Sequence, residues 1–196
     1  MKNIIVTLLL LLVWAMGTIS AQDNNSYTID EDLSHYYAMV DLTADVNTGL
    51  NTAWQLPIFE KITNSENRMI VLISERMRIM NIAENEAILK ESGVYADKGL
   101  QKLYDKLIPQ GAESLNNALL AAAELEENQL LFLEKALERT ENLDVILLYD
   151  QLRMISKKNL RSIAAQLQNE GVTYRPIVMS DEYFENQVMS DRGPIF

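Results

Sequence analysis

The chain has 196 residues, no cysteine, one histidine and a net charge of −11 at pH 7. A surface with this excess of acidic groups repels nucleic acid and anionic membranes, so we expect neither as a partner. Without cysteine the chain forms no disulfide and carries no thiol for a lipid anchor, and its stability must come from packing.

The first 21 residues have the composition of a secretory signal peptide. Lys2 precedes an apolar run from Ile4 to Met16, and small residues lead up to Ala21. A membrane-spanning helix needs about 20 apolar residues, and this run is shorter, so we expect cleavage after Ala21. The mature protein is then predicted to be secreted or periplasmic, with no membrane attachment after the signal is removed.

The rest of the chain predicts an all-α domain at 32–196, after a flexible lead-in at 22–31. Apolar residues recur at intervals of three and four through four long segments, and none of these alternates as a strand would. In chain order we expect long helices at about 32–54, 57–81, 114–139 and 142–169, and shorter ones within 97–111, stopping near Pro109 and Gly111, and at 180–189.

Several residues mark the ends of these helices. Pro57 separates the first two because it disfavours helical geometry at Leu56. Ser114 and Asn142 are good N-caps for the last two long helices, and Gly171 suits the end of the fourth. Four such helices are typical of an antiparallel four-helix bundle, and the long connection before Ser114 predicts one crossover.

Polar residues interrupt three of the four apolar stripes near their middles. Glu66 lies on the second long helix, Glu126 and Gln129 on the third, and Ser156 and Asn159 on the fourth. A buried carboxylate costs several kcal/mol unless it meets a cation, a hydrogen-bond donor or a metal. Proteins with a carboxylate-bridged metal pair offer one explanation, because their glutamates and histidines point inward from all four helices.

Four segments carry a resemblance to a known family: ADVNTGLNTAWQLPIF, LQKLYDKLIPQGAESLNNAL, LEENQLLFLEKALERTENLDV and QLQNEGVTYRP. From about Leu33 to Val188 the chain resembles the ferritin-like family of unknown function catalogued as domain of unknown function 2202. The resemblance implies a ferritin-like antiparallel four-helix bundle with a long crossover and a short C-terminal helix, whose intact members hold a pair of metal ions.

The chain departs from the family pattern at the implied metal ligands. Met39 and its neighbours replace a glutamate-rich stretch on the first helix, and Met69 stands where the second helix has the histidine of Glu-x-x-His. Gln129 replaces an aspartate on the third helix, and Asn159 replaces a histidine on the fourth. These four positions are therefore interpreted as degenerate ligand positions.

Only Glu66 and Glu126 survive as candidate metal ligands, and the single histidine, His35, lies too near the start of the first helix to join them. A di-iron centre needs about four carboxylates and two imidazoles, so we predict no catalytic residues and no cofactor. The two glutamates are instead expected to bond with Gln129, Ser156, Asn159, Arg153 or Lys157 in a metal-free centre that serves a binding or structural role.

Two other interpretations stay open for this centre. One divalent ion, iron or manganese, would lie between Glu66 and Glu126. Alternatively, Met39 and Met69, with or without Met154, would hold cuprous copper. The role is expected to involve an unidentified protein partner or small ligand, and a homodimer remains open.

Two further features have an ordinary structural explanation. The acidic stretches ELEEN, at 124–128, and DEYFEN, at 181–186, are expected to be solvated faces. Tyr36, Tyr37 and Trp54 are expected to pack the ends of the bundle.

Overall fold

The computed structural model describes residues 28–83 and 91–190, and within these ranges the chain is all-α, as predicted. The predicted signal peptide and residues 22–27 lie outside the described residues. The elements are α1 (Ile29–Trp54), α2 (Pro57–Ile79), α3 (Lys98–Glu113), α4 (Leu115–Arg139), α5 (Leu143–Asn169), α6 (Asp181–Tyr183) and the π-helical turn η1 (Phe184–Met189).

Local signals account for most of the helix ends. Thr28 caps α1 in a reciprocal capping box with Glu31, so residues 29–31, expected in the lead-in, belong to the helix. Ser114 and Asn142 cap α4 and α5 through their side chains, as their positions predicted. Gly171, with φ of 79°, follows the end of α5 in the left-handed conformation that favours glycine.

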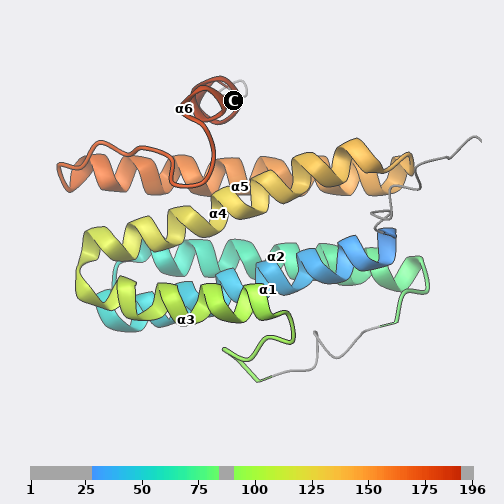
Figure 1. Cartoon of the computed structure of the whole chain (residues 1–196), viewed down its shortest axis with the longest axis horizontal. Helices are drawn as coiled ribbons and strands as arrows, with labels where there is room; N and C mark the ends of the chain where they lie inside the picture. Colours follow the sequence, from blue (N-terminus) through green and yellow to red (C-terminus); the bar gives the residue numbers. More distant parts are fainter. Residues whose placement is uncertain (1–27, 84–90, 191–196) are drawn as a thin grey trace, which may run out of the picture.

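Four long helices, α1, α2, α4 and α5, run along the long axis of the molecule (Figure 1). Side-chain contacts fix their directions. Arg139 near the end of α4 pairs with Asp32 near the start of α1, and Arg76 near the end of α2 pairs with Asp144 at the start of α5. Neighbouring helices are therefore antiparallel, and α2 and α4 run in the same direction.

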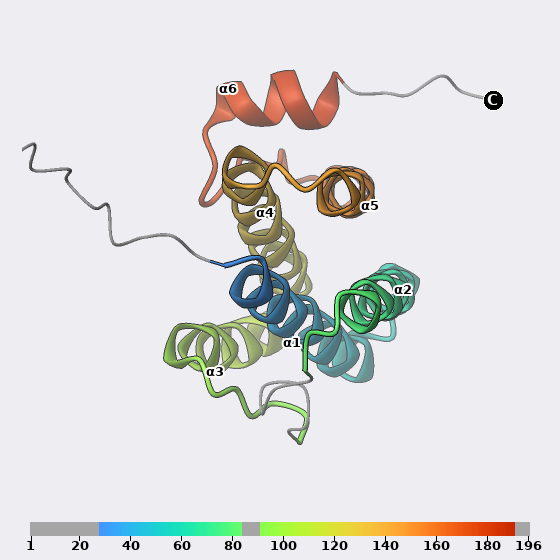
Figure 2. The ribbon, with the colours of Figure 1, turned by 90° about the vertical axis from the view of Figure 1, so that its right-hand side faces the viewer.

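The chain between α2 and α4 contains α3 and returns to the end from which α2 started (Figure 1). In the view along the helices, α3 lies outside the four long helices, where it packs on α1 and α4 (Figure 2). At the other side, the segment with α6 and η1 crosses over α4 and α5. Among the described helices, none is long and apolar enough to cross a membrane.

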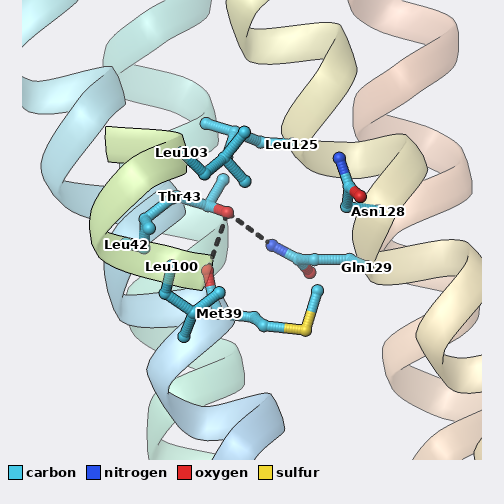
Figure 3. A pocket seen from close by; sticks show the side chains of 8 residues that line it. All are labelled: Met39, Leu42, Thr43, Leu100, Leu103, Leu125, Asn128 and Gln129. Carbon is cyan, nitrogen blue, oxygen red and sulfur yellow. Dashed lines mark hydrogen bonds between the residues drawn. The ribbon is translucent and has the colours of Figure 1, made fainter. Parts of the chain in front are cut away.

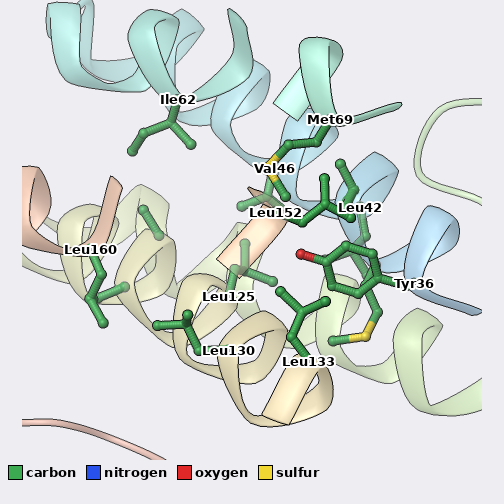
Figure 4. Packing of buried hydrophobic residues seen from close by; sticks show 14 of the residues in the cluster. Tyr36, Leu42, Val46, Ile62, Met69, Leu125, Leu130, Leu133, Leu152 and Leu160 are labelled. Carbon is green, nitrogen blue, oxygen red and sulfur yellow. The ribbon is translucent and has the colours of Figure 1, made fainter. Parts of the chain in front are cut away.

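The core is apolar except at its middle. In this core, apolar residues from all four long helices interdigitate. Met69, Leu125, Leu152 and Tyr36 are among them and converge in one close-packed region (Figure 4). Tyr36 and Met69 are fully buried. Tyr36 therefore does not pack a bundle end, as the sequence suggested, but places its phenol in the centre.

The short helix that the sequence predicted to stop near Pro109 and Gly111 is α3, which continues past Pro109 and ends at Glu113. A proline inside a helix removes one backbone hydrogen bond. Here tertiary contacts hold the last turn: Trp54 Nε1 donates to the carbonyl oxygen of Gly111 at 2.8 Å, and Gly111 packs directly against Leu50.

This close approach of α3 to α1 predicts that Gly111→Ala destabilises the protein. The added Cβ would lie 2.5 Å from Leu50 Cδ2, so the buried Leu50 side chain must move against its neighbours in the core. We expect a loss of about 1–3 kcal/mol of unfolding free energy in urea denaturation, the usual range for overpacking. Gly49→Ala is the control, because its Cβ would meet only the tip of Ile108 at 3.2 Å and the substitution favours the helix. Equal effects of the two substitutions would contradict this interpretation.

Candidate functional site

Polar side chains from all four long helices meet in the middle of the apolar core. We call this group the central polar layer; it consists of Tyr36 and Thr43 on α1, Glu66 on α2, Glu126 and Gln129 on α4, and Ser156 and Asn159 on α5. Each of these residues is at most 3% exposed. The structure therefore brings together the five polar positions that the sequence singled out: Glu66, Glu126, Gln129, Ser156 and Asn159.

Gln129 is the hub of the layer on the side of α1. Its Nε2 donates to Glu66 Oε2 and to Thr43 Oγ1, both at 2.8 Å. Its Oε1 accepts from the hydroxyls of Tyr36, at 2.9 Å, and Ser156, at 3.1 Å. Both ends of this amide are thus fully used, which fixes its orientation.

A small hollow lies beside Gln129, lined by residues of α1, α3 and α4 (Figure 3). Met39 is one of its walls, and the Thr43 hydroxyl bridges the carbonyl oxygen of Met39 and the Gln129 amide. The lining is mostly aliphatic, with Leu42 and Leu125 among its walls. Met39 therefore fills space next to the layer rather than contributing a polar contact through its side chain.

Asn159 connects the two carboxylates. Its Nδ2 donates to Glu66 Oε1 and to Glu126 Oε1, each at 3.0 Å. A carboxamide between two carboxylates must present its NH₂ group, because its oxygen would face two acceptors. Asn159 thus does for the pair what a bridging cation would do, by supplying positive partial charge to both.

Burial changes the protonation of this pair. Removal from water is the main cause that raises the pKa of Glu66 from 4.5 to about 8, although the hydrogen bonds from Gln129 and Asn159 act against it. Burial also raises the pKa of Glu126 well above its ordinary value, and the neighbouring charge of Glu66 adds to this. The two carboxyl groups therefore retain a proton at neutral pH. The second oxygen of Glu126, Oε2, is buried and has no hydrogen-bond partner.

The donor set does not fit a pair of metal ions. Two carboxylates are present, but the amides of Gln129 and Asn159 turn N–H groups toward them, and a cation needs lone pairs there. In residues 28–83 and 91–190 no group of three or more histidine, cysteine, aspartate or glutamate side chains is arranged to hold a metal ion. Iron or manganese pairs are thus disfavoured by the chemistry of the residues.

The copper interpretation named Met39 and Met69, with Met154 as an optional third ligand. Met39 and Met69 are buried in the core, whereas Met154 is 65% exposed on the outer side of α5. Met154 therefore does not join the other two, and a copper ion held by Met39 and Met69 stays a prediction. The expected contact of the carboxylates with Arg153 is also not formed, because Arg153 pairs with Glu134 and Asp150.

His35 lies away from the central polar layer. Its Nδ1 is 3.5 Å from Asp97 Oδ2, and its ring lies 5.4 Å from that of Phe132. It is 38% exposed on its side chain. Since Tyr36, the next residue, belongs to the layer, His35 is kept away from it by the face of α1 on which it lies, and not by its place near the start of the helix as the sequence suggested.

The sequence did not reveal a second buried carboxylate site, at Glu127. This side chain is fully buried and accepts hydrogen bonds from four donors in the segment after α5: the Tyr174 hydroxyl and the backbone N–H groups of Ile177, at 2.8 Å, Val178, at 2.7 Å, and Met179, at 2.8 Å. We call this arrangement the Glu127 clasp. The stretch ELEEN is thus not the solvated face that was expected.

The clasp belongs to a set of contacts that hold the C-terminal segment on α4 and α5. Tyr183 donates to Glu134 at 2.5 Å, and Arg161 donates to the carbonyl oxygen of Val188 at 2.7 Å. The GVTYRP stretch, whose Tyr174 enters the clasp, therefore has a structural explanation: it leads the chain from the end of α5 back to α4.

The comparisons with known proteins agree with this fold. The chain matches the family model described as "Uncharacterized protein domain (DUF2202)" over residues 35–191, and it belongs to that family. It is 31% identical over 157 residues to the uncharacterized protein MJ0754 of Methanocaldococcus jannaschii, across 78% of this chain and 83% of the other. The crystal structure of that hypothetical protein superposes with a TM-score of 0.77 and 28% identity, and the match covers 82% of this chain and 91% of the other.

Proposed function

We propose that the chain is an exported ferritin-like four-helix bundle whose centre is held by hydrogen bonds in the place of a metal pair, and that its role is a non-catalytic one in binding or structure. The observation that carries the proposal is the position of Asn159, which donates to both carboxylates. An amide here takes over the charge compensation that a bridging ion would provide.

The arrangement of the helices supports the ferritin-like part of the proposal. The polar layer draws residues from all four long helices at one level, and the chain crosses over between α2 and α4. Such inward-facing carboxylates at mid-bundle are the usual setting of di-metal sites. The role itself rests on a surface contact with a protein or small ligand, since the described centre is packed with side chains.

A second candidate is a single divalent ion between Glu66 and Glu126. The observation that favours it is Glu126 Oε2, a buried oxygen without a hydrogen-bond partner. One such oxygen, together with one from Glu66, would give a small oxygen site of the kind that iron or manganese accepts.

Elemental analysis separates the two candidates. The mature protein, purified from its own compartment without chelators, is expected to contain iron, manganese and copper far below one equivalent. Glu66→Gln/Glu126→Gln should remain folded, because the amides keep the shape and most hydrogen bonds of the neutral acids. Stoichiometric metal that disappears in this double variant, together with a rise in melting temperature on addition of that ion to the unaltered protein only, would establish the second candidate instead.

A further inference from the structure

An apolar stripe lies exposed on the side of α5 that faces away from the core. Leu143 is 75% exposed, Leu147 67% and Met154 65%. Their spacing of four and seven residues places them on one line along the helix. Large apolar side chains gathered in this way mark a surface that binds another protein more often than single exposed residues do.

The C-terminal segment leaves this stripe uncovered. It crosses α4 and α5 (Figure 2), where Arg161 donates to the Val188 carbonyl oxygen, and the exposure of the three stripe residues shows that it does not cover them. The stripe continues past Met154 to Lys158 and Ala165, which are both exposed. Asp150 and Arg161 on the same line are half-buried, so a line that is at least partly exposed extends along most of α5 in the described part of the chain.

The charges on α5 are distributed unequally along this line. Asp144 and Asp150 lie in its first half, and their side chains are 70% and 45% exposed. Lys158 and Arg161 lie in its second half. A helix that is acidic at its start and basic near its end is complementary to an antiparallel copy of itself.

From the stripe and this charge distribution we infer that the outer face of α5 is the contact surface between two copies of the chain, packed antiparallel about a two-fold axis at Met154. In such a pair residues whose numbers are equally distant from 154 face each other. Asp150 of one copy then lies opposite Lys158 of the second, and Leu143 lies opposite Ala165. The two Met154 side chains meet at the axis.

One helix face buries little surface, so the expected dimer is weak. Stable interfaces bury about 800 Å² on each partner, and a contact along a single helix falls near or below that value. We therefore expect the dissociation constant of the dimer to lie between about 1 μM and about 1 mM. This inference does not depend on the metal content of the central layer, and the Glu66→Gln/Glu126→Gln protein should form dimers equally well.

The lack of cysteine in the chain allows a direct test of the two-fold axis. Met154→Cys introduces a single thiol that should meet its copy at the axis, where a disulfide needs Cα atoms about 4.4–6.8 Å apart. Under mild oxidation the mature Met154→Cys protein is expected to become a covalent dimer. Val71→Cys, at a position 66% exposed on α2, is the control and should cross-link much more slowly. Equal rates for the two variants would overturn the assignment.

Charge exchange tests the antiparallel packing in the absence of a cross-link. Sedimentation equilibrium of the mature protein should show a monomer–dimer equilibrium, and Asp150→Lys alone should weaken it at least about tenfold, because two like-charged pairs then face each other. Asp150→Lys with Lys158→Asp should restore the original dissociation constant. A monomer at every concentration, or a double variant as weak as the single one, would overturn the inference. Leu147→Glu should abolish the dimer while the circular dichroism spectrum stays unchanged.

Discussion

Raising the pH from about 5 to about 9 is expected to lower the free energy of unfolding by on the order of 4 kcal/mol, at 1.36 kcal/mol per pKa unit. The pKa of Glu66 is 4.5 in the unfolded chain and is raised to about 8 by burial in the folded protein. Between these values the folded chain holds a proton that the unfolded chain has lost. The contribution of Glu66 to stability is therefore fully present below pH 4.5, and this contribution is lost as the pH rises through about 8.

The matched variant for this pH dependence is Glu66→Gln/Glu126→Gln. Its side chains imitate protonated acids at every pH, so the slope of unfolding free energy against pH should largely vanish in urea denaturation. Asp41, whose pKa burial raises to about 6 with help from Asp45, contributes a slope of the same sign at lower pH. In Asp41→Asn the slope at lower pH should disappear, and the slope from the central carboxylates should remain. Parallel curves for the unaltered protein and the double glutamine variant would show that the central carboxylates do not retain a proton.

The helices were predictable from the sequence because their signals are local. Side-chain caps at Ser114 and Asn142 and the glycine after α5 depend on a few neighbouring residues, and the apolar period depends on each helix alone. That α3 continues past Pro109 depends on contacts with Trp54 and Leu50, which come from another helix and cannot be seen in the local sequence. Tertiary packing there outweighs the local preference.

The central polar layer was predictable in part. Glu66, Glu126, Gln129 and Asn159 stand out because each is polar on an otherwise apolar stripe. Tyr36 was not predicted to belong to the layer, because an aromatic residue at helical spacing suggests ordinary packing. Only the folded structure shows that its hydroxyl donates to Gln129. Which groups the two amides meet depends on how the helices face each other, and the sequence of a single helix does not show this.

The Glu127 clasp could not be found from the periodicity of α4. Adjacent residues on a helix point about 100° apart, so Glu127 does not face the same centre as Glu126, and the sequence suggested solvent. What covers it is a segment about fifty residues later in the chain, which the tertiary fold brings back. The signal that was available was the GVTYRP ending, which marked the segment without indicating its contact.

Glu127→Ala is expected to lose about 3–5 kcal/mol of unfolding free energy, because it leaves the backbone N–H groups of Ile177, Val178 and Met179 without an acceptor, at about 1–3 kcal/mol for each unsatisfied buried group. The loss of unfolding free energy is limited because the C-terminal segment can detach, and its N–H groups then form hydrogen bonds with water. Limited proteolysis should accordingly cut near 172–180 much faster in this variant, while urea denaturation reports the global change.

Two comparisons identify the cause of that loss. Tyr174→Phe removes one donor to Glu127 and keeps the carboxylate, so it should cost only about 1 kcal/mol. Glu138→Ala, at an exposed position on the same helix, should change stability by less than about 0.5 kcal/mol. If Glu127→Ala behaved like Glu138→Ala, the carboxylate would not hold the segment; if it unfolded the chain without faster cleavage at 172–180, Glu127 would act through α4 alone. The Glu127 clasp predicts both effects together, the loss of stability and the faster cleavage at 172–180. The reason is that the Glu127 carboxylate is buried on α4 and is also the acceptor that binds the C-terminal segment to this helix.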